Sequence, residues 1–289
     1  MSPVTRRTFI GSMASAAALC AKAPANSADC HLHIYESRFP VDPKSKLRPP
    51  DATVADYRQV QERLGTTRCV IVQPSTYGVD NRCMLQAVAQ MGRSARGVAV
   101  VNSGVSDAEL KRMDAGGVRG IRFNLEQAGA TTLDMVEPLA KRIAPLGWHI
   151  QVNAGPEKIR EAGEIWKGLP VEVVFDHLAH VPAPGGLDSA YGLVIDLLEK
   201  RKGWVKLSGV YIDSKVGPPS YSDRKAITQA YVKNAPDRLV WGTDWPHPTV
   251  SGTKPDNLVL LNLLFDWVPD EETRTRILVR NPEKLYGFS

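Results

Sequence analysis

The chain has 289 residues, of which 43% are hydrophobic and 23% are charged, and these values are ordinary for a globular protein with room for one large core. Its formal net charge is +5, but Arg6, Arg7 and Lys22 lie in an N-terminal stretch without acidic residues, so residues 29–289 carry only about +2. Basic residues form no run and no stripe interleaved with aromatics, so no nucleic-acid partner is expected.

Residues 1–28 have the features of a targeting segment. A twin-arginine pattern occupies residues 5–10, and a short apolar run over residues 10–21 follows it. This run is too short to span a bilayer, so stable membrane insertion is not expected. We expect cleavage after Ala25 or Ala28 and export to the periplasm. An uncleaved N-terminus on a cytoplasmic protein is the alternative.

The cysteines do not suggest a disulfide framework. Cys30 and Cys69 fall on predicted buried strands, where a small thiol packs as an apolar group. Twin-arginine export carries proteins that have folded in a reducing compartment, and this agrees with buried free thiols. No disulfide is predicted.

From residue 29 onward, short runs rich in β-branched residues alternate eight times with longer helical patterns. Some helices carry their own end signals, such as the capping sequence that begins at Ser106 and the glycines that follow the patterns at Gly65 and Gly147. The predicted strands cover residues 29–34, 68–73, 96–102, 118–124, 148–153, 173–178, 204–208 and 239–244. The predicted helices cover residues 54–64, 81–91, 106–116, 132–146, 156–167, 189–202, 223–234, 257–267 and 270–279.

Eight strand–helix units over about 260 residues predict an α/β protein with a single-domain (β/α)8 TIM barrel over residues 29–289. An open doubly wound sheet would need a glycine-rich turn after the first strand, and residues 33–37 contain no glycine. The long irregular stretches 35–53, 179–188 and 209–223 all follow strands. They are therefore expected at the C-terminal face of the barrel, where active sites are built.

The first predicted strand carries His31 and His33 two residues apart. Side chains of a strand alternate between its faces, so both imidazoles are expected on the same side, with Cys30 on the other. The sixth strand ends in His177 and the eighth in Asp244. On a barrel these four side chains meet at one mouth, and three imidazoles facing a carboxylate suit metal binding or carbonyl chemistry.

These motifs resemble those of the amidohydrolase superfamily. The first-strand His-x-His, the sixth-strand Asp-His and the Gly-Thr-Asp-Trp-Pro-His at the eighth strand carry this resemblance. More narrowly, the chain is similar to 2-pyrone-4,6-dicarboxylate lactonases and to relatives acting on sugar-acid lactones, including galactarolactone isomerases. That similarity rests on residues 29–40, 72–82, 117–124, 146–149 and 241–248.

The resemblance implies a hydrolase that opens a lactone with water. The role of base transfers to Asp244, because a carboxylate near a water molecule can accept its proton as the water attacks an ester carbonyl. The three histidines then donate to the developing oxyanion: His31, His33 and His177.

The resemblance also implies catalysis without a metal. Relatives that use metals generally supply a further histidine on strand five, but here His149 lies at the start of that strand and Asn153 at its end. Arg122, near the end of strand four, would repel a cation. No cofactor is therefore favoured. The alternative is a single divalent metal, Zn or Mn, on four residues: His31, His33, His177 and Asp244.

The substrate is expected to be a small anionic lactone. Arg122 is placed to bind a carboxylate with two parallel hydrogen bonds, with a structural ion pair as its alternative role. Four further side chains near strand ends are candidates for hydrogen bonds to the substrate: Tyr77, Asn153, Tyr211 and Ser75. His180 and His247 are expected at the rim of the site, and Trp148 and Trp241 are expected in the core. Asp176 is expected to hydrogen-bond backbone groups behind the site.

Other functions remain open at this point. The loops at residues 125–129 and 209–213 contain no arginine, which weakens the assignment of a dicarboxylic pyrone and favours a hydroxylated sugar-acid lactone. Lactone isomerisation, a metal-dependent amidohydrolase or decarboxylase, and a periplasmic binding protein on the same scaffold are the alternatives. The sequence also leaves open whether the chain forms a homo-oligomer.

Overall fold

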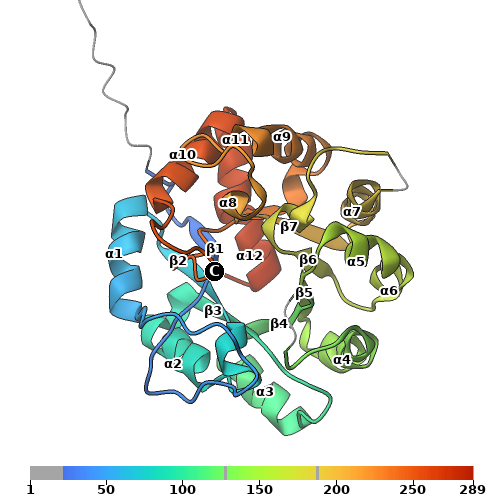
Figure 1. Cartoon of the computed structure of the whole chain (residues 1–289). Helices are drawn as coiled ribbons and strands as arrows, with labels where there is room; N and C mark the ends of the chain where they lie inside the picture. The colour runs from blue at the N-terminus through green and yellow to red at the C-terminus, as the bar shows by residue number, and fades with distance from the viewer. Residues whose placement is uncertain (1–21, 127–128, 187–188, 289) are drawn as a thin grey trace, which may run out of the picture.

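The computed structural model describes residues 22–126, 129–186 and 189–288. Within them, eight parallel strands follow one another around the sheet in chain order, and helices surround the strands on the outside (Figure 1). The predicted (β/α)8 barrel in a single domain is confirmed. The twin-arginine pattern and the apolar run that follows it lie outside the described residues.

The predicted strands are all present, although several end earlier than expected. The barrel closes just beyond the last strand, where Trp245 bridges Leu32 and the backbone N–H of Asp244 donates to the carbonyl of His31 at 2.7 Å. The strands are β1 (Ala28–Leu32), β2 (Arg68–Val72), β3 (Ala95–Ala99), β4 (Val118–Asn124), β5 (His149–Asn153), β6 (Val173–Phe175), β7 (Gly203–Leu207) and β8 (Leu239–Trp241).

Most of the helices form the outer ring and bury apolar side chains. Thr53 and Asp56 form a capping box at the start of the first helix, and Gly65 ends that helix with a left-handed φ of 78°. The helices are α1 (Val54–Leu64), α2 (Arg82–Met91), α3 (Asp107–Ala115), α4 (Val136–Ile143), α5 (Pro156–Glu161), α6 (Gly163–Gly168), α7 (Ala190–Glu199), α8 (Val210–Asp213), α9 (Lys225–Asn234), α10 (Asn257–Trp267), α11 (Glu271–Thr275) and α12 (Asn281–Tyr286). Among the described residues, no helix is both long and apolar enough to cross a membrane.

A bulge in β1 aims the first histidine into the barrel. Asp29 pairs with Cys69 and Leu32 with Ile71, so Cys30 and His31 together lie opposite the single residue Val70. Because of this extra residue, Cys30 packs in the inner cluster with Val70, while His31 also points inward. The prediction that Cys30 faces the opposite side from His31 is therefore wrong.

Strands β6 and β8 stop before their predicted ends because the chain turns into the left-handed region. His177 has a φ of 53° and Asp244 a φ of 62°. For a non-glycine residue this conformation costs about 1–2 kcal/mol, and such residues cluster at functional sites. Two of the four predicted catalytic side chains thus lie on strained turns at the barrel mouth rather than on strands.

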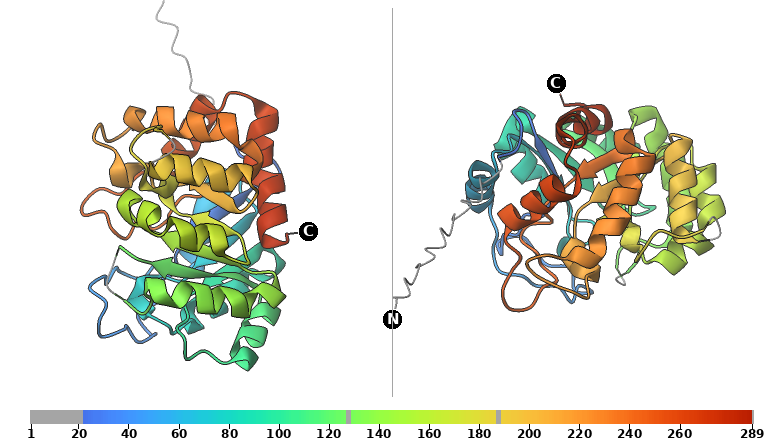
Figure 2. Two further views of the ribbon diagram at one scale, coloured as in Figure 1. Left: turned by 90° about the vertical axis from the view of Figure 1, so that its right-hand side faces the viewer. Right: turned by 90° about the horizontal axis from the view of Figure 1, so that it is seen from above.

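The end of the barrel opposite the long loops is closed by α12 (Figure 2, right). Tyr286 and Phe288 pack there against Cys30, Val70 and other inner residues. Trp148 and Trp241 are buried, as expected. The cysteines Cys30, Cys69 and Cys83 are buried and unbonded within the described chain.

Candidate active site

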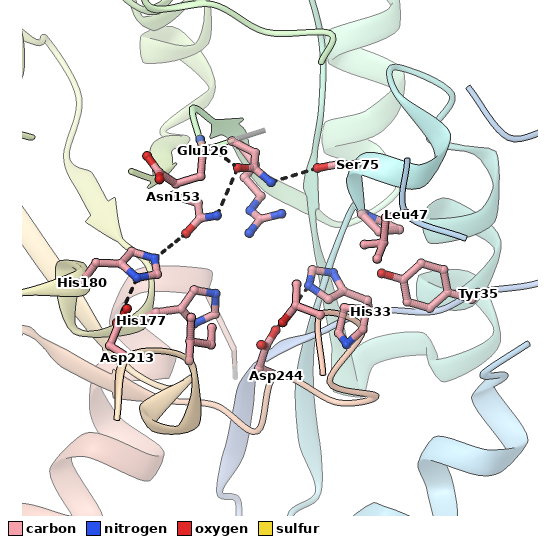
Figure 3. Close-up of a pocket in the computed structure, with 16 residues that line it drawn as sticks. His33, Tyr35, Leu47, Ser75, Glu126, Asn153, His177, His180, Asp213 and Asp244 are labelled. Carbon is pink, nitrogen blue, oxygen red and sulfur yellow. Dashed lines mark hydrogen bonds and ion pairs between the residues drawn. The ribbon is translucent and has the colours of Figure 1, made fainter. Parts of the chain in front are cut away.

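A cavity of about 270 Å³ opens at the C-terminal ends of the strands. Its wall contains histidine, carboxylate, amide and guanidinium side chains, and these come from elements that lie far apart in the sequence (Figure 3). Predicted site residues that line it are His33, Ser75, Arg122, Asn153, His177 and Asp244.

The carboxylate of Asp244 meets both histidines of β1. Oδ1 of Asp244 lies 3.5 Å from Nε2 of His31 and 3.4 Å from Nε2 of His33. The close approach depends on Gly242, where a Cβ atom would lie 2.6 Å from the backbone nitrogen of His31. The convergence predicted from barrel topology is therefore present, and all three side chains are buried.

The hydrogen bonds of His33 show which of its nitrogens is free. Nδ1 lies 2.8 Å from the carbonyl oxygen of Val72, which can only accept, so Nδ1 carries the proton. In a neutral His33 ring, Nε2 then presents a lone pair to the carboxylate of Asp244. A proton on Nε2 or a cation between the two atoms resolves this contact, since two acceptors repel each other.

The same atoms fit a divalent cation. Ligand atoms of His31, His33 and Asp244 all lie within 4.8 Å of one another, and Nε2 of His31 is buried without a hydrogen-bond partner in the described structure. Two imidazole nitrogens and one carboxylate oxygen are donors that zinc accepts. A metal can therefore be held here.

His177 occupies the opposite side of this group. Its ring centroid lies 4.8 Å from that of His31, and Nδ1 lies 3.0 Å from the hydroxyl oxygen of Ser208. When Ser208 donates to Nδ1, the ring proton resides on Nε2 and is available to a substrate oxygen. Burial lowers the pKa of His177 to about 4, so the ring is neutral near pH 7.

The charge of Asp244 is secured by its neighbours. Burial by itself would raise the pKa of this carboxyl, but His177, His33 and His31 together hold it well below its ordinary value. Tyr211, expected to contact substrate, instead donates its hydroxyl proton to Oδ2 of Asp244 at 2.5 Å. Asp244 is thus a fixed carboxylate with a set orientation.

Arg122 and Asp176 form a buried pair beneath the cavity. Nε of Arg122 donates to Oδ2 of Asp176 at 3.1 Å, while the arginine also lines the cavity. Oδ1 of Asp176 lies 3.2 Å from Nδ1 of His31. The expectation that Asp176 bonds backbone behind the site is wrong, because alternation along β6 turns Val174 and Asp176 inward and the following left-handed turn brings His177 inward as well.

Lys206 on β7 was missed by the sequence reasoning. Its ammonium group is fully buried, donates to Oε1 of Gln151 at 2.8 Å and lies 3.6 Å from Oδ1 of Asp176. Burial lowers the pKa of Lys206 to about 8, although Asp176 opposes that shift. The sequence did carry a signal for it, because a lysine between apolar residues on a strand that is buried on both faces must itself be buried.

The other predicted substrate contacts divide into two groups. Ser75 and Asn153 line the cavity and are linked through Asn124, whose Nδ2 donates to the hydroxyl of Ser75 at 2.9 Å. Tyr77 is engaged elsewhere, because its hydroxyl donates to the carbonyl of Glu36 at 3.1 Å and it does not line the cavity. We therefore revise Tyr77 to a structural residue.

Both loop histidines have polar partners. His180 lines the cavity and bonds Asn153 and Asp213, whereas His247 bonds Oδ1 of Asn257 at 3.0 Å behind the site. The sequence reasoning missed three further lining residues: Asn124 at the end of β4, Glu126 in the loop after β4, and Asp213 at the end of α8.

A (β/α)8 barrel with His-x-His on its first strand, a histidine after the sixth and an aspartate after the eighth defines an amidohydrolase-type site. Residues 28–288 match the Amidohydrolase family. The chain belongs to this family, as its motifs suggested.

The relatives act on lactones, according to their names. The 2-pyrone-4,6-dicarboxylate hydrolase of Comamonas testosteroni is 35% identical, covering 92% of this chain and 91% of that protein. The D-galactarolactone isomerase of Agrobacterium fabrum is 30% identical, covering 92% of each. A probable 2-pyrone-4,6-dicarboxylic acid hydrolase from Acinetobacter baumannii, solved with citric acid bound, has a TM-score of 0.81 and 27% identity. It covers 91% of this chain and 100% of that one.

Proposed function

We propose that this protein is an enzyme that hydrolyses the lactone of a small carboxylated substrate. The observation that carries the proposal is the carboxylate of Asp244 at the cavity wall, where it contacts Nε2 of His31 and of His33 and accepts a hydrogen bond from Tyr211. The named activities of relatives that align along nearly the whole chain support the same reaction class.

In this mechanism Asp244 accepts a proton from a water molecule as the water oxygen attacks the lactone carbonyl. Nε2–H of His177 donates to the oxygen that becomes negative. The ring C–O bond then breaks, and the proton held by Asp244 passes to the departing oxygen. Arg122 binds the carboxylate of the substrate and so fixes the carbonyl over Asp244.

Product analysis by NMR tests this proposal. The protein is incubated with 2-pyrone-4,6-dicarboxylate and, separately, with aldaric and aldonic lactones. Hydrolysis gives an open-chain acid with the oxygen of labelled water in its new carboxylate. A new ring without label would instead show isomerisation, the activity named for the Agrobacterium fabrum relative, in which a substrate hydroxyl replaces water.

Substituting Arg122 by lysine should raise KM more than it lowers kcat. Lysine keeps the positive charge but not the two parallel N–H groups, and it also loses the Nε bond to Asp176. We expect KM for a carboxylated lactone to rise about tenfold, which corresponds to roughly 1.4 kcal/mol of lost binding. The methyl ester of the same substrate is the control, since it lacks the carboxylate. An equal rise in KM for acid and ester would contradict carboxylate binding by Arg122.

We also propose that the reaction does not require a metal. Strands β4 and β5 end in Asn124 and Asn153, so neither supplies a strong metal ligand at the mouth. If a divalent cation is bound, His31, His33 and Asp244 would hold it, and it would polarise the lactone carbonyl.

Chelation should therefore leave activity unchanged. Protein purified without added metal is measured for metal content by mass spectrometry, then assayed before and after treatment with EDTA. We expect turnover within twofold of the untreated protein. Loss of turnover on chelation, with recovery on adding zinc or manganese, would overturn this proposal.

We further propose export to the periplasm through the twin-arginine pattern. Ser27 is buried and Ala28 is the first residue of β1, which supports cleavage after Ala25, because that position leaves β1 intact. Cell fractionation of the natural chain and of an Arg6→Lys, Arg7→Lys variant tests this. Equal distribution of the two between cytoplasm and periplasm would contradict it.

A further inference from the structure

The turn that carries His177 is a single left-handed turn of four residues. His177, Leu178, Ala179 and His180 have φ values of 53°, 58°, 56° and 53°. Leu178 and Ala179 are buried, so solvent does not stabilise this conformation. Four consecutive strained residues persist only where the surrounding structure holds them at both ends.

At its start, the turn is held by β6 and β7. The backbone N–H of Ala179 donates to the carbonyl of Asp176 at 2.9 Å, and His177 bonds Ser208. At its end, the side chain of His180 reaches the last residue of β5 and the last residue of α8. Nε2 lies 2.8 Å from Oδ1 of Asn153, and Nδ1 lies 3.0 Å from Oδ2 of Asp213. His180 thus connects the end of β5 with the segments that follow β6 and β7.

The direction of these hydrogen bonds follows from a backbone group. The N–H of Glu126 donates to Asn124 at 3.2 Å, which identifies the acceptor as Oδ1 of Asn124. Asn153 must then turn its NH2 group toward that oxygen, at 3.1 Å, and its own oxygen toward His180. Nε2 of His180 therefore donates. Figure 3 shows this chain from Ser75 to Asp213.

The second nitrogen of His180, Nδ1, faces the carboxylate of Asp213, so both ring nitrogens are engaged by protein partners. The ring of His180 packs edge to face against that of His177, with centroids 5.5 Å apart. Asp213 ends α8, which begins after Gly209, where a Cβ atom would lie 2.5 Å from Nδ1 of His177.

We propose that His180 and Asp213 are a positioning pair that clamps the left-handed turn and so holds the imidazole of His177 toward Asp244 and the substrate carbonyl. The inference rests on the proposed function, because it assigns the carbonyl-facing role to His177. Both ring nitrogens of His180 are hydrogen-bonded to protein groups, so this residue acts through His177 and not on the substrate directly.

Steady-state kinetics on a lactone that the wild-type protein opens test the pair. His180→Phe keeps a ring against His177 but removes both N–H groups, and we expect kcat to fall roughly ten- to a hundredfold with KM within threefold. Asp213→Leu should behave similarly. Asp213→Asn is the matched conservative variant, because its amide can donate to Nδ1 of a neutral His180, and it should retain kcat within threefold.

The outcomes are distinct. A His180→Phe protein with kcat within twofold of wild type, or a loss confined to KM, would overturn the positioning role. If His180→Phe does not fold, Asp213→Leu is compared with Asp213→Asn instead. Equal kcat values for those two variants would overturn the positioning role.

A measurement without substrate separates this inference from the proposed function. In protein labelled with 15N-histidine, the ring nitrogens of His180 are assigned by comparison with Asp213→Leu and His180→Phe. A hydrogen-bonded proton on Nδ1 that is lost in Asp213→Leu is expected, and its absence from the wild-type protein would overturn the pair. Failure of the wild-type protein to open any lactone would instead overturn the proposed function.

Discussion

Replacing Asp244 by asparagine is expected to lower kcat by about 10²–10⁴-fold, the range that a positioned general base contributes. The amide has the same shape, so the bond from Tyr211 and the contacts with His31 and His33 can be kept. What is lost is the acceptor for the proton of water. Because Asp244 is charged over the whole neutral range, the loss should be the same at pH 6 and pH 8.

Asp196→Asn is the matched control for this variant. Asp196 lies on α7, does not line the cavity and pairs with Lys200 at 2.7 Å, and surface pairs of this kind contribute little to stability. Its kcat should equal that of the wild-type protein. Asp244→Asn with turnover within tenfold of wild type would remove Asp244 from the role of base.

Replacing Asp176 by asparagine is expected to cost about 3–5 kcal/mol of unfolding free energy, as for other buried ion pairs that lose one partner. The side chain of Asp176 is fully buried and is the counter-charge for Arg122 and Lys206, whose side chains are 5% and 0% exposed. Without this carboxylate, two buried cations lie near each other with only neutral groups between them. Urea unfolding followed by circular dichroism measures the change.

Two controls show that the loss arises from charge. Adding Lys206→Met to Asp176→Asn removes one of the stranded cations, so the double variant should be more stable than Asp176→Asn alone. Burial already lowers the pKa of Lys206 to about 8, below its value in the unfolded chain. Asp176 opposes that shift, so its loss lowers the pKa of Lys206 further in the variant. The penalty should therefore shrink as pH rises from 7 to about 8, where only the variant has already lost this proton in its folded state, and stay constant at higher pH. A deficit that does not change with pH would contradict this origin.

The local pattern of the sequence was sufficient for the barrel. Strand runs such as residues 68–73 and helical runs such as residues 54–64 differ in period, and glycines such as Gly65 mark the ends. Topology then placed His31, His33, His177 and Asp244 at one mouth without any contact information, because parallel strands of a barrel end on the same face.

Only the tertiary structure decided what each side chain does there. The bulge at Cys30 and His31 and the left-handed turns at His177 and Asp244 break the simple alternation that sequence reasoning assumed. His177 therefore points inward beside Asp176, Tyr211 bonds Asp244, and Lys206 and His180 join the site. Side-chain direction beyond a strand end depends on backbone dihedrals that distant packing imposes, and a pattern of neighbouring residues carries no record of them.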